Sequence, residues 1–544
     1  MNASIAQPPG QAAKHVEPSA SDMRLIIAAS SAGTVFEWYD FFIYGTLGAI
    51  LAKTFFPSGN ATLEMLLFWL VFAVGFGFRP LGAVLFGFLG DRLGRKYTFL
   101  VTVMLMGVAT AGVGMVPSAE AIGWWAPGLV ILMRVLQGLA LGGEYGGAAV
   151  YVAEHAPPGR RGYFTSYIQA GVVGGFVLSL VVVLGCKAAL STESWLAWGW
   201  RLPFLLSFAL LAISLWMRLK LSESPVFKAM QEEGEIAANP FVESFTYPGN
   251  KRRIFVALFG VAAALTVIFY TAMFSGMSFL KSTMHLDDTA AELMTGAAAM
   301  IGMSFYLLVG HISDRIGRKK PIVIGYALTL LLLFPAFWIM GASGERAGGS
   351  EPWTISGAKC SYDAFATVQA SDCGKLMGDF TGAGIAYTLV DAPTLGLAVG
   401  GRPLDVAGLD WQDAKARKAQ IEARAGSPVF SAPKVKPGIW QVVQIVGAML
   451  LLMVLSAMTY GPVAALLSEM FPPRVRYSSM SIPYHIGTGY FGGFQPLIAT
   501  YMVAKTGDPY SGLWYTWAVV LMGLVVAAWG LKGGMPRDFG EDDG

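Results

Sequence analysis

Cysteine, charge and catalytic motifs are all scarce in this chain of 544 residues. Its three cysteines are too few for a disulfide scaffold and lack the spacing of a zinc site. There is no G-x-x-x-x-G-K-S/T loop, which disfavours ATP-driven transport, and no nucleophile–base or metal-ligand motif that would indicate an enzyme. Charged residues make up 13% of the chain, whereas a soluble domain carries about 25%. We therefore expect no enzyme activity, no metal and no cofactor.

What the chain has instead is apolar side chains. Hydrophobic residues make up 55% of it, the mean hydropathy is +0.55, and its 66 glycines are typical of helices that pack closely in lipid. The net charge of +3 is too small for a nucleic-acid-binding surface, so we expect no nucleic-acid partner. Residues 1–22 are polar and lack the pattern of a cleavable signal peptide, so we expect a disordered tail there.

Twelve apolar stretches are long enough to cross a hydrocarbon core of about 30 Å. They predict an all-α membrane protein with twelve transmembrane helices, several of which must tilt, kink or protrude. The stretches lie near residues 25–52, 65–89, 98–117, 124–153, 164–186, 202–217, 254–280, 290–312, 321–341, 438–468, 480–504 and 512–531.

Lysine and arginine are concentrated in alternate short loops, and this asymmetry predicts the orientation. The basic loops lie near residues 92–96, 160–161, 251–253, 315–320 and 474–476. The opposite short loops hold little beyond single lysines. We therefore expect the basic loops and both termini to be cytoplasmic, in a multi-pass protein of the bacterial inner membrane.

The chain also repeats itself. GFLGDRLGRK at 87–96 returns as GHISDRIGRK at 310–319, which is 223 positions later. YGGAAVYVAEHAPPGRRGYFTS at 145–166 returns as YGPVAALLSEMFPPRVRYSSMS at 460–481, which is 315 positions later. Two six-helix halves of the same topology follow, related by an axis along the membrane normal. The difference between 315 and 223 leaves 92 residues for an insertion between helices nine and ten, on the periplasmic side.

Residues 343–437 are the only polar stretch of that length in the second half, so the insertion is expected there. DWQDAKARKAQIEARAG (410–426) predicts a short charged helix, and IAYTLVDA (385–392) predicts a strand. A disulfide between Cys360 and Cys373 would add roughly 3 kcal/mol, and two free thiols are an equal alternative. A lid, a partner-docking site and an inert elaboration are all open. The predicted parts are a tail (1–22), a first bundle (23–220), a central cytoplasmic loop (221–253), a second bundle (254–342 and 438–531), the periplasmic insertion (343–437) and a cytoplasmic tail (532–544).

Four charged residues of the first half, Glu37, Asp40, Arg79 and Arg134, are expected near mid-membrane. At 1.5 Å per residue, Asp40 and Arg134 lie about 20 and about 14 Å inside the outer face, and Arg79 lies about 18 Å from the cytoplasmic end of helix two. Charges at such depths pair with one another or face a wet cavity. They indicate a proton switch, and the alternative is ion pairs that only hold helices together. Glu37 shares a helix face with Asp40 and is expected to support it.

Ordered motifs through nearly all of the chain outside 343–437 resemble the major facilitator superfamily, and within it the metabolite:proton symporter family. They include EWYDFFIYG, RPLGAVLFGFLGDRLGRK, RVLQGLALGGEYGGA, EHAPPGRRGYFTSYIQAG, SDRIGRK and YGPVAALLSEMFPPRVRYSSMSIPYHIG. The resemblance implies import of a small polar metabolite with protons: a dicarboxylate, a shikimate-like acid, citrate, proline or betaine. It also implies that Asp40 and Arg134 form a coupling pair similar to that of the sugar porters.

Polar residues within the spans are the candidates for substrate contact. Arg79 and Arg134 favour an anion, and Gln137 lies one turn from Arg134. The second half has almost no ions in its spans, so neutral contacts are expected there; the alternative for each residue is an interhelical hydrogen bond. His485 is either a titrating group or a packing residue. The remaining candidates are Tyr39, Gln169, Tyr270, Gln441, Tyr460 and Tyr484.

The repeated loop motifs predict a cytoplasmic gate. Their acids and bases are placed to form ion pairs at helix ends, and Gly94 permits a tight turn. In the superfamily such clusters resemble a latch that holds one conformation and breaks in the other. Retention of positive charge inside explains the basic residues but not the repeated acids. The predicted gate residues are Asp91, Arg92, Gly94, Arg95, Lys96, Glu154, Arg161, Asp314, Arg315, Arg318, Glu469 and Arg476.

These observations favour a monomeric secondary transporter that imports a small organic metabolite, expected to be a carboxylate, with protons by alternating access. An osmolyte (proline or betaine) or sugar symporter is the alternative, in which the arginines stay paired with protein acids. A transporter-like sensor acting through the insertion is the second alternative. Helix five lacks the Gly-Pro element common in antiporters of the superfamily, which favours symport.

Overall fold

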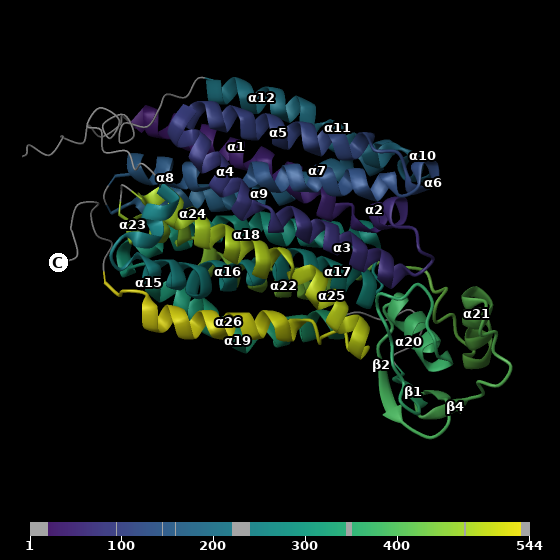
Figure 1. Cartoon of the computed structure of the whole chain (residues 1–544). Helices are drawn as coiled ribbons and strands as arrows, with labels where there is room; N and C mark the ends of the chain where they lie inside the picture. The colour runs from purple at the N-terminus through teal and green to yellow at the C-terminus, as the bar shows by residue number, and fades with distance from the viewer. Residues whose placement is uncertain are drawn as a thin grey trace, which may run out of the picture.

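The computed structural model describes residues 20–93, 95–143, 145–157, 159–219, 240–343, 351–472 and 475–534. Gly94 and most of the predicted tails and central loop therefore lie outside the described residues. Figure 1 shows the helices running side by side along the long axis, with a small α/β unit at one end. We call this end the insertion end, and the opposite end, which carries the basic loops, the basic end.

The described part of the first half contains the first six predicted spans, several of them built from more than one helix. They are α1 (Ala20–Thr46) with α2 (Gly48–Phe55), α3 (Ala61–Gly77) with α4 (Arg79–Leu93), α5 (Arg95–Met115), α7 (Trp125–Gly142) with α8 (Tyr145–His155), α9 (Arg161–Ala189), and η1 (Gly199–Arg201) with α11 (Leu202–Leu205) and α12 (Ser207–Leu219). The short helices α6 (Ala119–Ile122) and α10 (Thr192–Ala197) lie in the connections.

The described part of the second half contains the other six. They are α15 (Asn250–Phe255) continued by η2 (Val256–Ala262), α16 (Ala263–Tyr270), η3 (Thr271–Ser275), α17 (Gly276–Ser278) and η4 (Phe279–Thr283); α18 (Asp288–Ile316); α19 (Lys319–Ala342); α22 (Ile439–Tyr460) with α23 (Val463–Met470); α24 (Arg476–Ile486) with η6 (Gly487–Gly493) and α25 (Gln495–Thr506); and α26 (Leu513–Gly530). The helix α14 (Pro240–Thr246) precedes them. The segments η2, η3, η4 and η6 are π-helices, a geometry frequent at functional sites.

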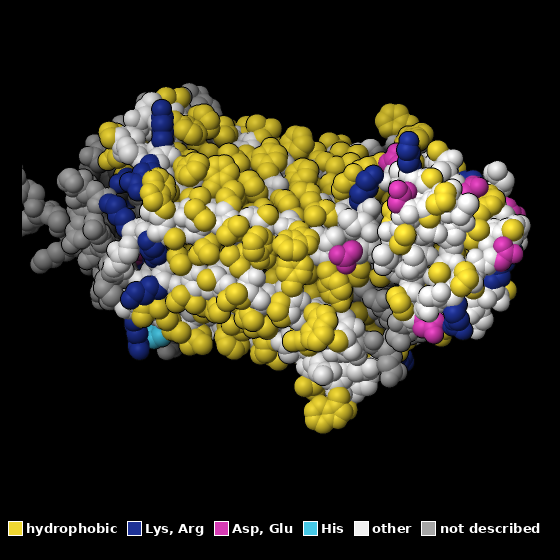
Figure 2. All heavy atoms as spheres, turned by 90° about the horizontal axis from the view of Figure 1, so that it is seen from below, with side chains coloured by type: hydrophobic (Ala, Val, Ile, Leu, Met, Phe, Trp, Pro, Cys, Tyr) yellow, Lys and Arg dark blue, Asp and Glu magenta, His cyan; other side chains and the backbone are white. Residues whose placement is uncertain are grey.

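The surface of the molecule is that of a membrane protein. Within the described residues, nine helices are long and apolar enough to cross a bilayer. Figure 2 shows hydrophobic side chains in a broad belt across the middle, with Lys and Arg at the basic end and a mixture of Lys, Arg, Asp and Glu at the insertion end. Trp125 and Trp440, which are 77% and 78% exposed, stand in the first turns of α7 and α22. Tryptophan is favoured at such places because its ring suits the lipid–water interface.

Two of the predicted spans are interrupted by proline. The second span is interrupted at Phe78, because Pro80 lacks a backbone N–H and is tolerated only in the first turn of a helix, so α4 begins at Arg79. The tenth span is interrupted at Gly461 and Pro462, between α22 and α23. The first of these breaks places Arg79 at the start of a new helix.

Glycines bring α3 and α4 very close to α7. A Cβ atom on Gly138 would collide with the carbonyl oxygen of Gly75, and one on Gly142 would collide with that of Arg79. Glycine is therefore required at both positions, as at close helix crossings in membranes. Arg79 and Arg134 are held by these same helices.

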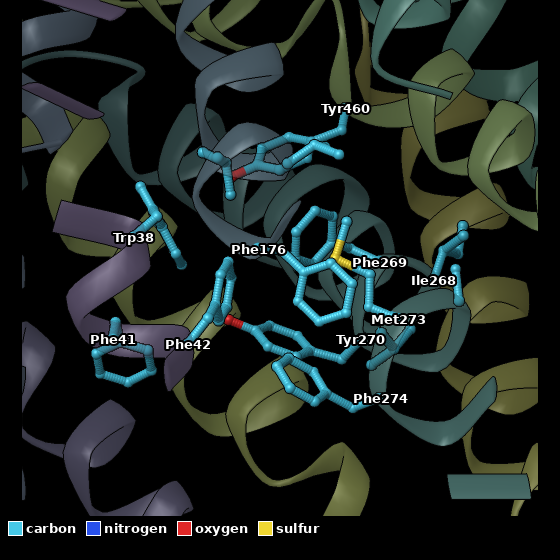
Figure 3. Close-up of a cluster of buried hydrophobic side chains, with 14 of the residues drawn as sticks. Trp38, Phe41, Phe42, Phe176, Ile268, Phe269, Tyr270, Met273, Phe274 and Tyr460 are labelled. Carbon is cyan, nitrogen blue, oxygen red and sulfur yellow. The ribbon is translucent and has the colours of Figure 1, made fainter. Parts of the chain in front are cut away.

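Aromatic rings fill the seam between the two halves. Phe42 of α1 lies 5.6 Å from Phe274 and 6.3 Å from Tyr270, measured between ring centroids. Phe176 of α9 lies 5.4 Å from Phe274. Figure 3 shows these rings around Tyr270, whose hydroxyl points toward Phe42. We call these four residues, together with Trp69 and Phe72, the aromatic seam.

Residues 351–437 fold into the α/β unit at the insertion end. The strands β1 (Trp353–Gly357), β2 (Tyr387–Asp391), β3 (Gly396–Val399) and β4 (Arg402–Leu404) form one sheet in the order β2-β1-β3-β4. β1 runs parallel to β2 and antiparallel to β3. The helices are α20 (Asp372–Gly382) and α21 (Ala414–Ala425). The predicted strand and charged helix correspond to β2 and α21, and a disulfide joins Cys360 to Cys373, so they are not free thiols.

The insertion contacts both halves. Asn60, at the start of α3, donates a hydrogen bond to the Ala366 carbonyl at 3.2 Å. Lys505, in the last turn of α25, donates to the Tyr362 carbonyl at 3.1 Å. The insertion therefore spans the outer ends of the two halves.

Candidate functional site

Arg79 is a buried cation with no counter-ion among the residues that the structure describes. Its side chain is 0% exposed, and its guanidinium lies 5.4 Å from the Trp38 ring and 5.2 Å from the Phe76 ring. Its Nε, Nη1 and Nη2 atoms have no hydrogen-bond partner among the described residues. Such a buried charge is costly unless something supplies acceptors. The fork of N–H groups suits a carboxylate, which can accept two parallel hydrogen bonds.

Three tyrosines, Tyr145, Tyr460 and Tyr484, interact electrostatically with Arg79, and together with Gln169 they form two pairs related by the internal repeat. Gln169 Nε2 donates to the Tyr145 hydroxyl at 2.6 Å, and the hydroxyls of Tyr460 and Tyr484 are 2.7 Å apart. Tyr460 follows Tyr145 by 315 positions, and Tyr484 follows Gln169 by the same interval. The rings of Tyr145 and Tyr484 stack across the two halves at 3.8 Å. The two halves thus contribute equivalent groups to one place.

Other buried polar atoms here also lack partners within the described chain. They are both ring nitrogens of His485, the Tyr270 hydroxyl and Gln169 Oε1. The His485 ring lies 5.4 Å from that of Tyr484. Because buried polar groups are almost always hydrogen-bonded, such a grouping indicates where a ligand or water completes the bonds. We call the whole set the central site: Arg79, Tyr145, Gln169, Tyr270, Tyr460, Tyr484 and His485.

Arg134, in contrast to Arg79, has protein partners. It is also 0% exposed, and its Nη1 donates to Gln137 Oε1 at 2.6 Å. Its guanidinium lies 4.1 Å from the Phe41 ring and 4.6 Å from the Tyr44 ring. The predicted proximity of Arg134 and Gln137 is therefore present in the structure.

No ion pair joins Arg134 to the Asp40 carboxylate in the described structure. Gln137 holds the Arg134 guanidinium, and its own Nε2 donates to the Thr110 hydroxyl at 2.7 Å and lies 3.5 Å from the backbone oxygen of Asp40. The Asp40 carboxylate lies near Ser207 of α12, and its Oδ1 is buried without a hydrogen-bond partner in the described part. The coupling pair implied by motif position is thus not formed in this conformation, because Asp40 points toward α12. Glu37 is buried one turn away.

Tyr39 and Gln441 lie apart from the central site. The Tyr39 hydroxyl donates to the Pro203 carbonyl at 2.6 Å, which ties α1 to α11. Gln441 lies in the first turn of α22, where its side-chain oxygen accepts the N–H of Gly438 at 2.7 Å. Both side chains therefore have structural partners, and we leave them out of the proposed substrate contacts.

At the basic end, Asp314 of α18 caps the first turn of α9 in the other half. Its two carboxylate oxygens accept the backbone N–H groups of Gly162 and Tyr163, each at 2.8 Å. A carboxylate is favoured there because those N–H groups have no partner within the helix and the helix dipole attracts negative charge. Arg318 donates to the same carboxylate at 2.7 Å.

Further ion pairs complete this gate. Arg318 Nη2 donates to Glu469 at 2.8 Å within the second half, and Arg476 Nη1 lies 3.2 Å from Glu154 of the first half. Arg161 is buried, and Arg315 is exposed. The contacts of Asp314 and Arg476 cross between the halves, so the basic end is closed. The side chains of the other predicted members lie outside the described residues: Asp91, Arg92, Gly94, Arg95 and Lys96.

Tyr145 belongs to the central site but is absent from the candidates predicted by the sequence. The signal was available, because the repeat places Tyr145 at the position of Tyr460, which is a candidate. The rings of Trp38 and Phe76 that enclose Arg79 carry no such signal, since they stand among many other aromatic residues.

Known proteins share this fold. A profile for the family "Sugar (and other) transporter" matches residues 25–253. Over 345 residues the chain is 35% identical to the glycine betaine/proline/ectoine/pipecolic acid transporter OusA of Dickeya dadantii, covering 60% of this chain and 69% of that protein. Over 379 residues it is 35% identical to the shikimate transporter of Escherichia coli, covering 68% of this chain and 84% of that protein.

Among solved structures, the fold is similar to that of the proton:xylose symporter XylE bound to 6-bromo-6-deoxy-D-glucose. The TM-score is 0.62 at 16% sequence identity, over 94% of this chain and 96% of that chain. XylE is a protein of E. coli. Together with the curated relatives, this places the twelve spans described above in a known architecture. The chain is a multi-pass membrane transporter that belongs to the sugar (and other) transporter family of the major facilitator superfamily.

Proposed function

We propose that this chain imports a small metabolite bearing a carboxylate, together with protons, across the inner membrane of a bacterium. The observation that carries the proposal is Arg79, a fully buried guanidinium without an acceptor among the described residues. A carboxylate would neutralise that charge and accept two of its hydrogen bonds. A neutral sugar would leave the charge unpaired.

The named substrates of the two curated relatives fit this chemistry. Glycine betaine, proline, ectoine, pipecolic acid and shikimate all bear a carboxylate. They differ in the rest of the molecule, which is a hydroxylated ring in shikimate and a group with a positively charged nitrogen in the other four. The hydroxyls of Tyr270, Tyr460 and Tyr484 suit the former by hydrogen bonding.

The osmolyte class is the second candidate, favoured by the aromatic lining. The Phe42 ring lies 5.0 Å from that of Trp38 and 6.3 Å from that of Tyr270, beside the central site (Figure 3). A quaternary ammonium binds to such ring faces by cation–π attraction. In that case Arg79 still holds the carboxylate, instead of being paired with a protein acid.

Asp40 is the proposed proton carrier. It is buried, and no cation pairs with it in the described structure. Because an ionised carboxylate is costly at such a depth, Asp40 carries its proton in this conformation. In the proposed cycle, Arg134 leaves Gln137 for Asp40 after the proton is released, and Glu37 supports that exchange.

The proposed cycle has an occluded state like the conformation described here, with the gate closed at the basic end and the aromatic seam closed above the central site. The positive-inside rule makes the basic end and both termini cytoplasmic and the insertion periplasmic. Breaking the gate contacts would then release the substrate into the cytoplasm. The transporter is proposed to act as a monomer.

The test is uptake by proteoliposomes that contain the full chain, with an imposed pH gradient. Labelled shikimate and glycine betaine are compared with choline, which keeps the quaternary ammonium but lacks the carboxylate. We expect uptake of at least one carboxylate and no competition by choline. Arg79→Gln should reduce that uptake roughly 10- to 150-fold, because a hydrogen bond to a charged group contributes about 1.5–3 kcal/mol.

Arg160→Gln, at an exposed position of the basic end, is the matched control and should leave uptake unchanged. Competition by choline as strong as that of glycine betaine would contradict the carboxylate assignment. Uptake of no candidate under any gradient would favour the sensor alternative.

A further inference from the structure

A cavity of about 480 Å³ lies at the insertion end. Its walls are the first turns of α3, the outer part of the seventh span from Phe274 to His285, and α25. The insertion closes it from above with residues 381–386, Lys418 of α21 and the segment around Phe430. The cavity therefore exists only because the insertion covers the ends of the helices.

The charged side chains that line this cavity are all basic. They are Lys281, Lys418 and Lys434, with His285 beside them, and the lining contains no Asp or Glu. The rest of the lining is apolar, glycine or hydroxyl-bearing, including Ser275, Ser278, Ser282 and Thr283. A chamber lined by one sign of charge with low-dielectric walls concentrates ions of the opposite sign.

The carboxylates that pair with these lysines stand outside the lining, and some of them hold two cations. Glu292 takes both Lys187 and Lys281, each at 2.7 Å. Lys434 pairs with Asp288 at 2.7 Å.

Lys418 is the most weakly held of the three lining lysines. Asp379 binds Arg417 at 2.6 Å but Lys418 only at 3.7 Å. The Lys418 side chain is 35% exposed, whereas that of Arg417 is 5% exposed. Of the three lining lysines, Lys418 is therefore the one most available to a ligand.

The floor of the cavity leads to the central site. Trp69 and Phe274 line its lower part, and both belong to the aromatic seam. Tyr270, a member of the central site, stacks on Phe274 at 5.8 Å (Figure 3). Tyr270 in turn lies 5.2 Å from Phe76, one of the two rings beside Arg79, so aromatic rings separate the cavity from Arg79.

We propose that the insertion completes an entrance site for small organic anions, in which Lys418, Lys281 and Lys434 capture a carboxylate compound before the aromatic seam opens. The identity of the anion as the transported substrate rests on the proposed function, but the site itself does not. The proposal gives residues 351–437 a role in substrate capture. If the insertion were only a structural cap, the charged side chains that line the cavity would not need to be all basic.

The test measures the electrostatics of the cavity directly, without transport. A single cysteine is introduced as Ser282→Cys, a nearly isosteric change at an exposed cavity position, in a Cys186→Ser background that keeps the native disulfide. Rates of modification by the anionic reagent MTSES and the cationic reagent MTSET are compared in the full chain. Val368→Cys, at a 75% exposed position of the insertion outside the cavity, is the control position.

We expect the MTSES/MTSET rate ratio to be several-fold higher at Ser282 than at Val368 and to fall with added salt. Lys418→Gln should lower the ratio at Ser282 at least about twofold, because it removes a nearby charge that acts oppositely on the two reagents. Lys415→Gln, at an exposed position on the same helix, should leave it unchanged. Equal ratios at the two positions, no effect of Lys418→Gln, or no reaction at Ser282 would each overturn the proposal.

Transport of labelled shikimate provides the second readout. Lys418→Gln should raise the KM severalfold and leave the maximal rate unchanged, since capture precedes the central site. The MTSES/MTSET rate ratio is measured without transport, so it does not depend on whether shikimate is carried. A failure of the proposed function is thereby distinguished from a failure of the entrance site.

Discussion

At the residue scale, two buried arginines of the first half differ in their surroundings, and that difference assigns them different roles. Arg134 is held by Gln137 and by the faces of Phe41 and Tyr44. Arg79 has aromatic faces but no acceptor in the described structure. A cation with an exchangeable protein partner suits a coupling switch, whereas a cation with none suits a substrate anion.

Asp40 provides the test of coupling at this scale. Asp40→Asn removes the ionisable group and keeps the shape of the side chain. We expect it to abolish accumulation of substrate against a gradient, because no proton is carried, and to spare exchange of labelled for unlabelled substrate. Both are measured in proteoliposomes.

The control for Asp40→Asn is Glu120→Gln, which neutralises an exposed acid on α6. This variant should accumulate substrate normally. If Asp40→Asn still concentrates substrate, the proton is carried elsewhere, and Glu37 becomes the next residue to replace.

At the element scale, the positions of the candidate site side chains depend on where helices are interrupted and where glycines let helices pack closely. Pro80 ends α3 and starts α4 at Arg79. Gly138 lets α7 approach α3 so closely that side-chain atoms are excluded at that crossing. The π-helical segments of the seventh and eleventh spans lie next to Tyr270 and His485. Irregular backbone of this kind is where a helix can change shape as a transporter opens.

Gly138→Ala tests this close crossing. The added Cβ would collide with the Gly75 carbonyl oxygen, so the helices must separate, and overpacking of this kind costs about 1–3 kcal/mol. We expect a lower thermal unfolding temperature of the purified protein and a loss of transport, because α3, α4 and α7 hold both arginines.

Gly128→Ala on the same helix is the matched control, since nothing lies within 4 Å of its added Cβ atom. It should leave both the unfolding temperature and transport unchanged. Equal behaviour of the two variants would show that the crossing is looser than the structure indicates.

At the scale of the whole molecule, the two ends are held together in different ways. The basic end is closed by charged contacts between the halves, of which the cap of α9 by Asp314 is the most direct. The insertion end is covered by an added α/β unit that contacts both halves. A motion that separates the halves at the insertion end must therefore move the insertion away from at least one of them.

Asp314→Asn should shift the molecule toward conformations open at the basic end. Loss of this charged helix cap, which joins the halves, destabilises the conformation closed at the basic end by about 1–2 kcal/mol. This corresponds to a change of roughly 5- to 30-fold in the ratio of open to closed molecules. Spin labels at the exposed positions Arg160 and Ile316 report the separation of the halves there by distance distributions.

Asp508→Asn is the control for the gate, because Asp508 accepts a backbone N–H of Tyr510 within the second half at the insertion end. Its distance distribution should match that of the unmodified protein. An unchanged distribution in Asp314→Asn would mean that the other gate contacts suffice to hold the basic end closed.

Part of the central site was predictable because the repeat relates its residues. Gln169 and Tyr484 stand at equivalent positions, and both are candidates from the sequence. Tyr39 and Gln441 were equally polar and equally placed in apolar stretches, yet their hydroxyl and amide groups are occupied by backbone partners. Residue type and depth do not reveal which polar side chain already has a partner.

By itself the sequence determined the membrane class, the twelve spans in two related halves and the buried charges of the first half. These follow from apolar length, loop charge and repetition, which are properties of residues near one another in the chain. Only the tertiary structure decided that Arg79 has no acceptor among the described residues, that Asp40 turns toward α12 and makes no ion pair there with Arg134, and that the insertion roofs a basic cavity. Those outcomes depend on helix breaks, side-chain rotamers and contacts between distant segments, which no local pattern specifies.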